Sequence, residues 1–254
     1  MHGGCPVSDI LLTIVMPAYN EGKRIGLALE KTLAYLDGQP FASQVIVVDD
    51  GSQDDTAQVV QAYGARTPHL RLLCNESNRG KGYSIRRGVS EAAGRYIGFA
   101  DADYKTPIEE FEKIWPWLQE GFDVVIGSRK LQDSRVEVPQ PLYRRLGSKA
   151  FTLAMHVLVG LWDIDDTQCG FKFLRREAAL DVFSRQRVDR YMFDVESLAI
   201  ARQLGYRIKQ VPIRWQNDAD SRYRVVSGTM RNFVELMRIR LALWRHPPSR
   251  NRRA

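Results

Sequence analysis

The stretch AAGRYIGFADADYKTPIEEF, residues 92–111, carries the pattern on which the fold prediction rests. Its apolar run YIGFA is bounded by Gly94 and Pro107, which predicts a short buried strand. The proline and the glutamates after it predict the start of a helix. Asp101 and Asp103 therefore follow the carboxyl end of a strand. Because alternate residues of an extended chain point to the same side, we expect both carboxylates to converge on one cation held by oxygen ligands.

Apolar runs of the same kind alternate with helical patterns on either side of this stretch. Strands are predicted at residues 11–17, 44–50, 69–75, 95–101 and 122–128. Helical spacing separates them at residues 22–36, 54–64, 79–94 and 107–121. Repeated strand–helix–strand units predict an α/β fold with a mostly parallel sheet and helices on both faces. In such sheets ligands bind at the carboxyl ends of the strands.

Polar loops follow four of these strands and should meet at one edge of the sheet in a single crevice. Asp49 and Asp50 suit hydrogen bonds to a ribose or a base, and Gly51 allows the backbone to turn closely. The loop NRGKG, residues 78–82, opens a helix and offers amides and Lys81 to a phosphate. The alternative is a surface lysine at an ordinary helix start. The dinucleotide motif Gly-x-Gly-x-x-Gly does not follow the first strand, which argues against a nicotinamide cofactor.

Composition and cysteine usage are those of a globular protein from a reducing compartment. The chain has 254 residues, of which 44% are hydrophobic and 26% charged. Cys5, Cys74 and Cys169 are far apart and form no Cys-x-x-Cys pair, so we expect free thiols and no zinc site. The sequence contains no apolar run of the roughly 18 residues that a membrane span needs, and its start does not resemble a signal peptide. We therefore expect a cytoplasmic location.

The positive charge is concentrated toward the carboxyl terminus. Residues 202–254 contain 13 Lys and Arg against 3 Asp and Glu, whereas residues 1–201 contain 24 against 27. A basic tail suits nucleic acid, anionic lipid or a solvated helix face. A nucleic-acid-binding module is the remote alternative, because basic and aromatic residues do not alternate on one surface and no helix-turn-helix or zinc spacing occurs. We expect no nucleic acid partner.

The ordered motifs at the strand ends resemble those of the large glycosyltransferase family two. These motifs are VMPAYNE, VVDDGSQDDT, NRGKG, DADYKTP, IGSR and DTQCGFK, and the resemblance covers about residues 11–240. Members of the family are inverting enzymes, and the resemblance implies their GT-A fold, a Rossmann-like α/β domain. Within the family, TQCGFK together with FDVE most resembles the dolichyl-phosphate glucosyltransferase branch and its prokaryotic polyprenyl-phosphate relatives.

The resemblance implies a single domain at residues 11–228, preceded by an N-terminal extension at 1–10. Its nucleotide-sugar half covers about residues 11–128, and its acceptor half about 129–228. Residues 229–254 are predicted to form a basic amphipathic helix and a disordered tail. Other elements predicted in the second half are helices at 142–160 and 193–205 and a strand at 207–213.

Family members bind a nucleoside-diphosphate sugar as donor, and the matching positions can be named. They are Pro17, Tyr19, Glu21 and Asp50 for the nucleoside, Lys81 near the diphosphate, and Asp101, Ala102 and Asp103 for the nucleotide sugar. Asp101 and Asp103 also match the ligands of Mg²⁺ or Mn²⁺, with Asp103 the more direct ligand and a catalytic residue. Mannosyl members carry a Gln two residues after the second Asp, where this chain has Lys105, so that metal contact is expected to differ.

A second set of matching residues implies a phosphate on the acceptor. In lipid-phosphate members it is held by an arginine of the Gly-Ser-Arg turn and by an Arg and a Ser on the next helix. These positions are Arg129, which is also a candidate catalytic residue, Arg144 and Ser148. Paired guanidinium groups suit a phosphate because they form charge-assisted bidentate hydrogen bonds. The alternative for Arg144 is that it only solvates a helix.

This chemistry does not require a general base. A phosphomonoester carries about −1.5 to −2 charge near neutral pH, so it arrives as a ready nucleophile. Some relatives place an acid where this chain has Cys169 and Gly170. Asp194 is the remaining candidate base, and a helix-capping role is its alternative.

Two segments predict contact with a membrane or with a lipid chain. Near residues 229–244, apolar residues recur at helical spacing while Arg231, Arg238 and Arg245 fall elsewhere, which suits anionic lipid or packing on the sheet. The segment 142–162 has a similar character and includes the presumed acceptor arginine. We therefore expect a protein peripheral to the cytoplasmic face of a membrane.

Together these features predict an inverting, metal-dependent hexosyltransferase. The expected reaction moves glucose from UDP-glucose to a polyprenyl phosphate such as dolichyl or undecaprenyl phosphate. Alternatives within the same fold are GDP-mannose as the donor or a soluble acceptor.

Overall fold

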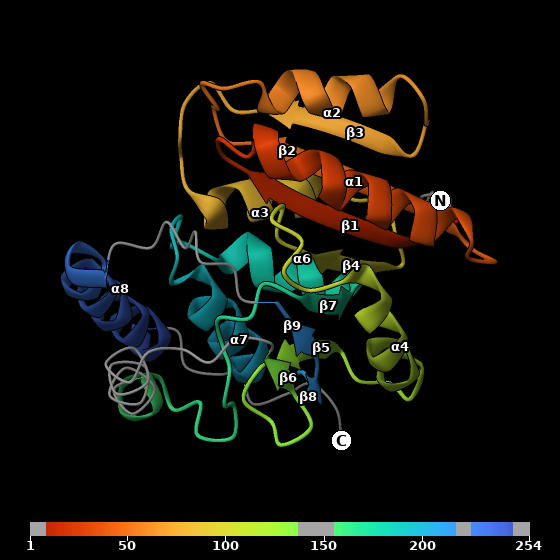
Figure 1. Cartoon of the computed structure of the whole chain (residues 1–254). Helices are drawn as coiled ribbons and strands as arrows, with labels where there is room; N and C mark the ends of the chain where they lie inside the picture. Colours follow the sequence, from red (N-terminus) through yellow and green to blue (C-terminus); the bar gives the residue numbers. More distant parts are fainter. Residues whose placement is uncertain (1–8, 137–154, 217–224, 246–254) are drawn as a thin grey trace, which may run out of the picture.

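The computed structural model describes residues 9–136, 155–216 and 225–245, and Figure 1 shows their arrangement. The main sheet contains β1 (Ile10–Ala18), β2 (Ala42–Asp49), β3 (Leu70–Cys74), β4 (Tyr96–Phe99), β5 (Val124–Ser128), β7 (Lys172–Arg175) and β8 (Ile208–Pro212). The helices are α1 (Gly22–Asp37), α2 (Thr56–Gly64), α3 (Lys81–Glu91), η1 (Ile108–Glu110), α4 (Phe111–Gln119), α6 (Arg176–Arg185), α7 (Phe193–Gln203) and α8 (Val225–Arg245). Strands β6 (Arg135–Val136) and β9 (Arg214–Trp215) pair separately. The strands and helices predicted in the first half of the chain are all confirmed.

The main sheet has seven strands in the order β3-β2-β1-β4-β7-β5-β8. Strand β7 runs antiparallel to both of its neighbours, and the other neighbouring strands are parallel. The prediction of a mostly parallel sheet is therefore confirmed. The sequence pattern did not predict β7 or α6, because KFLR is short and charged at both ends and so carries no clear strand period.

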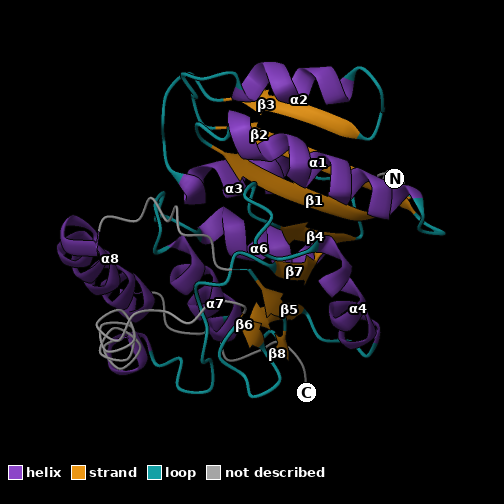
Figure 2. Cartoon of the chain, in the orientation of Figure 1, coloured by secondary structure: helices purple, strands orange, loops and turns teal. Residues whose placement is uncertain are grey.

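Helices cover both faces of the sheet, as predicted (Figure 2). Each face has its own hydrophobic core. Successive side chains of a strand point to opposite faces. In β1, Leu12 and Ile14 therefore join the core under α1 and α4, whereas Val15 joins the core under α3, α6 and α7. Burial on both faces gives the loops at the carboxyl ends of β1, β2 and β4 a rigid base.

Helix α8 lies on the outer side of α7 (Figure 1). Its Leu236 and Ile239 are each 1% exposed and join the α7 core, and the side chain of Gln203 donates a hydrogen bond to the Leu243 carbonyl. The helix therefore packs on a helix rather than on the sheet. An apolar stripe faces outward and comprises Val234, Met237, Leu241 and Trp244. Within the described parts of the chain, none of the helices has the length and apolar character to span a bilayer.

Several predictions fall on residues outside the described ranges. Residues 137–154 contain most of the predicted 142–160 helix, of which only residues 155–160 are described, and residues 155–159 of these are helical. Arg144 and Ser148 therefore lie outside the described residues, as do the N-terminal extension up to residue 8 and the tail after residue 245.

Candidate active site

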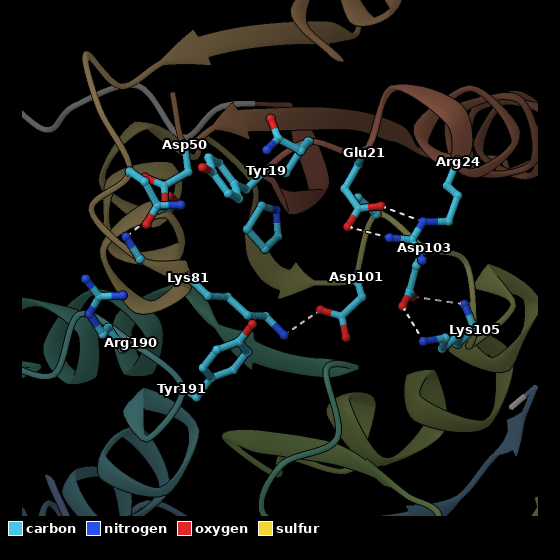
Figure 3. Close-up of a pocket in the computed structure, with 17 residues that line it drawn as sticks. Tyr19, Glu21, Arg24, Asp50, Lys81, Asp101, Asp103, Lys105, Arg190 and Tyr191 are labelled. Carbon is cyan, nitrogen blue, oxygen red and sulfur yellow. Dashed lines mark hydrogen bonds and ion pairs between the residues drawn. The ribbon is translucent and has the colours of Figure 1, made fainter. Parts of the chain in front are cut away.

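A cavity of about 720 Å³ opens at the carboxyl ends of β1, β2 and β4 (Figure 3). All eight residues predicted to bind a nucleotide sugar line it, namely Pro17, Tyr19, Glu21, Asp50, Lys81, Asp101, Ala102 and Asp103. These residues come from four separate loops that parallel strand order brings to one edge. The loops after β1, β2 and β4 therefore share one crevice as expected, whereas the described residues of the loop after β5 do not line it.

The segments after β1 and β2 are tied to each other by hydrogen bonds from backbone amides to side-chain hydroxyls. The amide of Asn20 donates to the Ser52 hydroxyl at 2.9 Å, and the amide of Glu21 donates to the Thr56 hydroxyl at 2.8 Å. Gly51 has φ 73°, and a Cβ there would lie 2.7 Å from the backbone carbon of Ser77. Only glycine fits this approach, so the predicted close turn after Asp50 is present.

Asp50 organises the loop that opens α3. Its carboxylate is 3% exposed and accepts hydrogen bonds from the Asn75 amide at 2.7 Å and from the backbone amides of Arg79 at 2.9 Å and Gly80 at 2.8 Å. The protein itself thus supplies donors to both oxygens of Asp50. This arrangement positions the N-terminus of α3 at the cavity, and the predicted nucleoside contact of Asp50 stays a prediction.

Lys81 is the first residue of α3, and its side chain reaches Asp101 across the cavity at 2.5 Å (Figure 3). Burial alone would lower the pKa of this lysine, but the nearby carboxylates of Asp101 and Asp194 outweigh burial and raise the pKa above its usual range. Lys81 is therefore an ammonium at neutral pH. Beside a helix N-terminus, it suits the phosphates of a nucleoside diphosphate.

Asp101 and Asp103 lie on a turn rather than on extended chain. Strand β4 ends at Phe99, and Tyr104 closes the turn with φ 53°. The Asp103 carboxylate pairs with the Lys105 ammonium at 2.9 Å, so the two carboxylates face different lysines. The extended geometry expected for this pair is wrong, because the chain begins to turn as soon as it leaves the sheet.

The two carboxylates nevertheless fit a divalent cation. Their side chains are 40% and 19% exposed and line the cavity. Among the described residues no group of three or more His, Cys, Asp or Glu is placed to hold a metal ion. Mg²⁺ commonly takes one or two protein carboxylates and completes its shell with substrate phosphates and water. Asp101 and Asp103 supply that minimum set of oxygen ligands.

Arg129 follows β5 and is held by Asp166. Its Nε and Nη2 donate to the two carboxylate oxygens at 2.7 and 2.8 Å, and its backbone amide donates to one of them at 3.0 Å. Burial would raise the pKa of Asp166, which is 2% exposed, but the arginine outweighs burial and lowers this pKa to about 2. Arg129 is outside the lining of the described cavity, and its contact with an acceptor phosphate stays a prediction.

Asp194 lies in the first turn of α7 and is 4% exposed. Burial raises the pKa of its carboxyl, while the ammonium groups of Lys172 and Lys81 oppose that rise. The carboxylate accepts a hydrogen bond from Lys172, which also donates to the Cys169 carbonyl at 2.5 Å. The helix-capping alternative is wrong, since Met192 is the N-cap of α7 and the Asp194 side chain binds a lysine. A role as general base stays a prediction.

Sequence reasoning missed Arg190 and Tyr191, which come from the second half of the chain and also line the cavity. The preceding Asp189 holds this loop on α3. Its carboxylate pairs with Arg86 at 2.6 Å, and its carbonyl accepts from the Tyr83 amide at 3.1 Å. No strand end or motif marks these residues, because their position depends on a contact between distant segments. Arg24, which pairs with Glu21 at 2.7 Å, was also missed, because an arginine in the first turn of a helix carries no motif of its own.

Cys74 and Cys169 are free thiols, which confirms that prediction for the cysteines within the described residues. Cys169 is 1% exposed, and burial raises the pKa of its thiol to about 12. Its thiol is therefore neutral at physiological pH and unsuited to a nucleophilic role.

The chain is similar to known proteins in sequence and in fold. Residues 13–183 match the family model of glycosyl transferase family 2. A dolichyl-phosphate beta-glucosyltransferase of Trichomonas vaginalis is 37% identical over 93% of this chain and 74% of its own length. The dolichyl-phosphate beta-glucosyltransferase of Homo sapiens is 36% identical over 80% of this chain and 67% of its own length.

A solved structure shares the fold at much lower sequence identity. Glucosyl-3-phosphoglycerate synthase of Mycobacterium tuberculosis, in complex with Mn²⁺, UDP and glucosyl-3-phosphoglycerate, matches with a TM-score of 0.68 and 20% identity over 91% of this chain and 80% of that one. The GT-A fold expected from the motifs is thereby confirmed. By its sequence and its fold, the chain belongs to glycosyl transferase family 2, in the branch of the dolichyl-phosphate beta-glucosyltransferases, and is a glycosyltransferase.

Proposed function

We propose that this enzyme transfers glucose from UDP-glucose to dolichyl phosphate or a related polyprenyl phosphate, with inversion at the anomeric carbon. One observation carries the donor part of the proposal: every residue that the sequence assigned to a nucleotide sugar lines one cavity. The lipid acceptor and the glucose are proposed because the relatives, at 31–37% identity over more than nine tenths of this chain, are dolichyl-phosphate beta-glucosyltransferases.

Mg²⁺ or Mn²⁺ is the proposed cofactor. Asp101 and Asp103 would hold it, and such an ion would neutralise the charge that develops on the departing nucleoside diphosphate. Support comes from the two carboxylates at the cavity and from the Mn²⁺ and UDP bound by the structural neighbour. Lys81, at the N-terminus of α3, is placed to add a fixed positive charge near the same phosphates.

The acceptor phosphate acts as the nucleophile in this proposal. It is mostly dianionic near neutral pH, so the protein has only to hold it in line behind the anomeric carbon. Arg129 is suited to this task because Asp166 fixes its guanidinium from behind through two hydrogen bonds. Arg144 and Ser148 are proposed to complete the phosphate site.

The lipid acceptor requires contact with a membrane, and we propose the cytoplasmic face. The outward stripe of α8 supports this proposal, since Met237, Leu241 and Trp244 are 39%, 49% and 78% exposed. Exposed Arg238 and Arg240 on the same helix could attract anionic lipid.

Release of nucleoside diphosphate by the purified protein tests this function. The donors UDP-glucose, UDP-galactose, UDP-N-acetylglucosamine and GDP-mannose are each supplied with Mg²⁺ or Mn²⁺, with and without a short polyprenyl phosphate. Release that requires both UDP-glucose and the lipid is expected. Release from GDP-mannose would overturn the donor assignment, and release from UDP-glucose that the lipid does not increase would point to a soluble acceptor.

A further inference from the structure

The cavity contains as many basic as acidic side chains. Its acidic residues are Glu21, Asp50, Asp101 and Asp103, and its basic residues are Arg24, Lys81, Lys105 and Arg190. Three of the carboxylates form ion pairs with three of the cations inside the cavity itself, as Figure 3 shows. The site is therefore already neutralised before any ligand enters.

The two lysines bind the carboxylates that are proposed to hold the divalent cation. The Nζ of Lys81 lies 2.5 Å from an oxygen of Asp101, and the Nζ of Lys105 lies 2.9 Å from an oxygen of Asp103. Both of the paired ammonium groups are held locally. Lys81 is anchored in α3, and the backbone of Lys105 is fixed by hydrogen bonds with Asp103 at 3.3 Å and with Gln216 at 2.8 Å. A metal ion would compete with them for these carboxylates, because each ammonium group already binds one carboxylate oxygen.

We propose that Lys81 and Lys105 are built-in counterions that keep Asp101 and Asp103 from binding a divalent cation until a nucleoside diphosphate enters. The diphosphate then takes over the ammonium groups, and the carboxylates take the metal. This inference rests on the proposed function, since it needs a nucleoside-diphosphate donor, and it adds an order to that binding: metal alone binds weakly, and metal together with nucleotide binds tightly.

Exchange is accessible because these pairs are partly open to solvent. The four side chains are 18–40% exposed, so a ligand that enters the cavity can compete for both members of each pair. Without a nucleotide, a metal ion has to compete with the two lysines for the carboxylates. Once bound, it would also be repelled by the two ammonium groups beside it. A diphosphate removes that repulsion, because its negative oxygens bind both the metal and the lysines. Linkage then requires the metal to tighten nucleotide binding by the same factor.

Lys105→Met removes one counterion and keeps the length and the apolar stem of the side chain. Mn²⁺ binding is measured by electron paramagnetic resonance with and without UDP, so the readout is independent of turnover. We expect the variant to bind Mn²⁺ alone about tenfold more tightly than the unaltered protein, which corresponds to about 1.4 kcal/mol. The factor by which UDP tightens Mn²⁺ binding should shrink correspondingly.

Two further variants keep this test sharp. Lys113→Met removes a lysine that pairs with Glu110 at 2.6 Å outside the cavity, and it should leave Mn²⁺ binding unchanged. Lys105→Arg keeps the charge and should retain the weak binding of Mn²⁺ alone. A change of less than twofold in Lys105→Met, while the unaltered protein still binds UDP with Mn²⁺, would overturn the counterion inference and leave the proposed function standing. Failure of the unaltered protein to bind UDP with Mn²⁺ would overturn both.

Discussion

Ion pairs of the same residue types occur in two regions of this enzyme and differ in burial. In the cavity, the Lys81–Asp101 and Lys105–Asp103 side chains are 18–40% exposed. Behind the cavity, Lys172 and Asp194 are 1% and 5% exposed, and Asp166 is 2% exposed where it holds Arg129. The side chain of Arg129 is 27% exposed, so the second group differs from the first in its two carboxylates and in Lys172, which are closed off from solvent.

This difference in burial separates ion pairs whose partner can be exchanged for a ligand from ion pairs that hold a side chain in position. A solvent-exposed pair stabilises the fold little and can trade its partner for a ligand. A buried pair cannot, because removal of one member leaves an uncompensated charge in a region of low polarity. The partly open pairs are thus suited to ligand exchange in the cavity, and the buried pairs fix the positions of the side chains behind it.

The largest expected effect concerns the exposed region. Asp103→Ala should lower turnover by roughly a thousandfold, because a metal that stabilises the leaving group by several kcal/mol loses a ligand. Steady-state release of UDP measures the effect. The variant should unfold at the same urea concentration as the unaltered protein, and near-normal turnover would show that Asp103 is no metal ligand.

The next effect concerns the buried region. Asp194→Asn should destabilise the protein by about 3–5 kcal/mol, because it leaves the Lys172 ammonium buried without its counterion. Urea unfolding followed by circular dichroism gives the value. Asp101→Asn, which removes a carboxylate from an exposed pair, is the matched control and should cost less than about 1 kcal/mol. An equal loss of stability in the two variants would show that burial does not distinguish the ion pairs of the two regions.

Acid should weaken the buried pair of Asp166 and Arg129. The carboxyl pKa is about 2 in the folded protein against an ordinary value of 3.8, so the pair stabilises the fold fully above about pH 4 and loses this contribution as pH falls toward 2. At about 1.4 kcal/mol per unit, the contribution is about 2 kcal/mol. Urea unfolding of the unaltered protein and of Asp166→Asn should therefore give a stability difference that narrows below pH 4. A difference that stays constant from pH 6 to pH 3 would contradict this assignment.

The smallest expected effect concerns the acceptor. Arg144→Ala should raise the KM for polyprenyl phosphate by about tenfold, or about 1.4 kcal/mol, and leave UDP binding nearly unchanged. Calorimetric titration with UDP and kinetics with varied lipid separate the two quantities. Weakened UDP binding in this variant would assign Arg144 to the donor instead. Arg144→Lys tests geometry, since an ammonium keeps the charge but not the bidentate hydrogen bonds.

Local pattern and chain order were enough to predict much of the molecule. Every strand of the first half was predicted, and every donor residue from Pro17 to Asp103 lies in the expected crevice, because parallel strands place successive loops at one edge. Strand β7 escaped prediction, since a short charged segment has no recognisable period and its antiparallel insertion is decided by its neighbours.

Periodicity and motifs within a few residues of each other were enough to predict the strands of the first half, the order of the polar loops and the family. Three placements follow from the packing of distant segments instead: Asp166 holds Arg129, Lys172 pairs with Asp194, and Arg190 and Tyr191 from the second half line the cavity. The hydrogen bonds that fix these placements join residues that are separated by 22, 37 and 103 positions in the sequence. Their partners are selected by burial and distance, which no local pattern encodes.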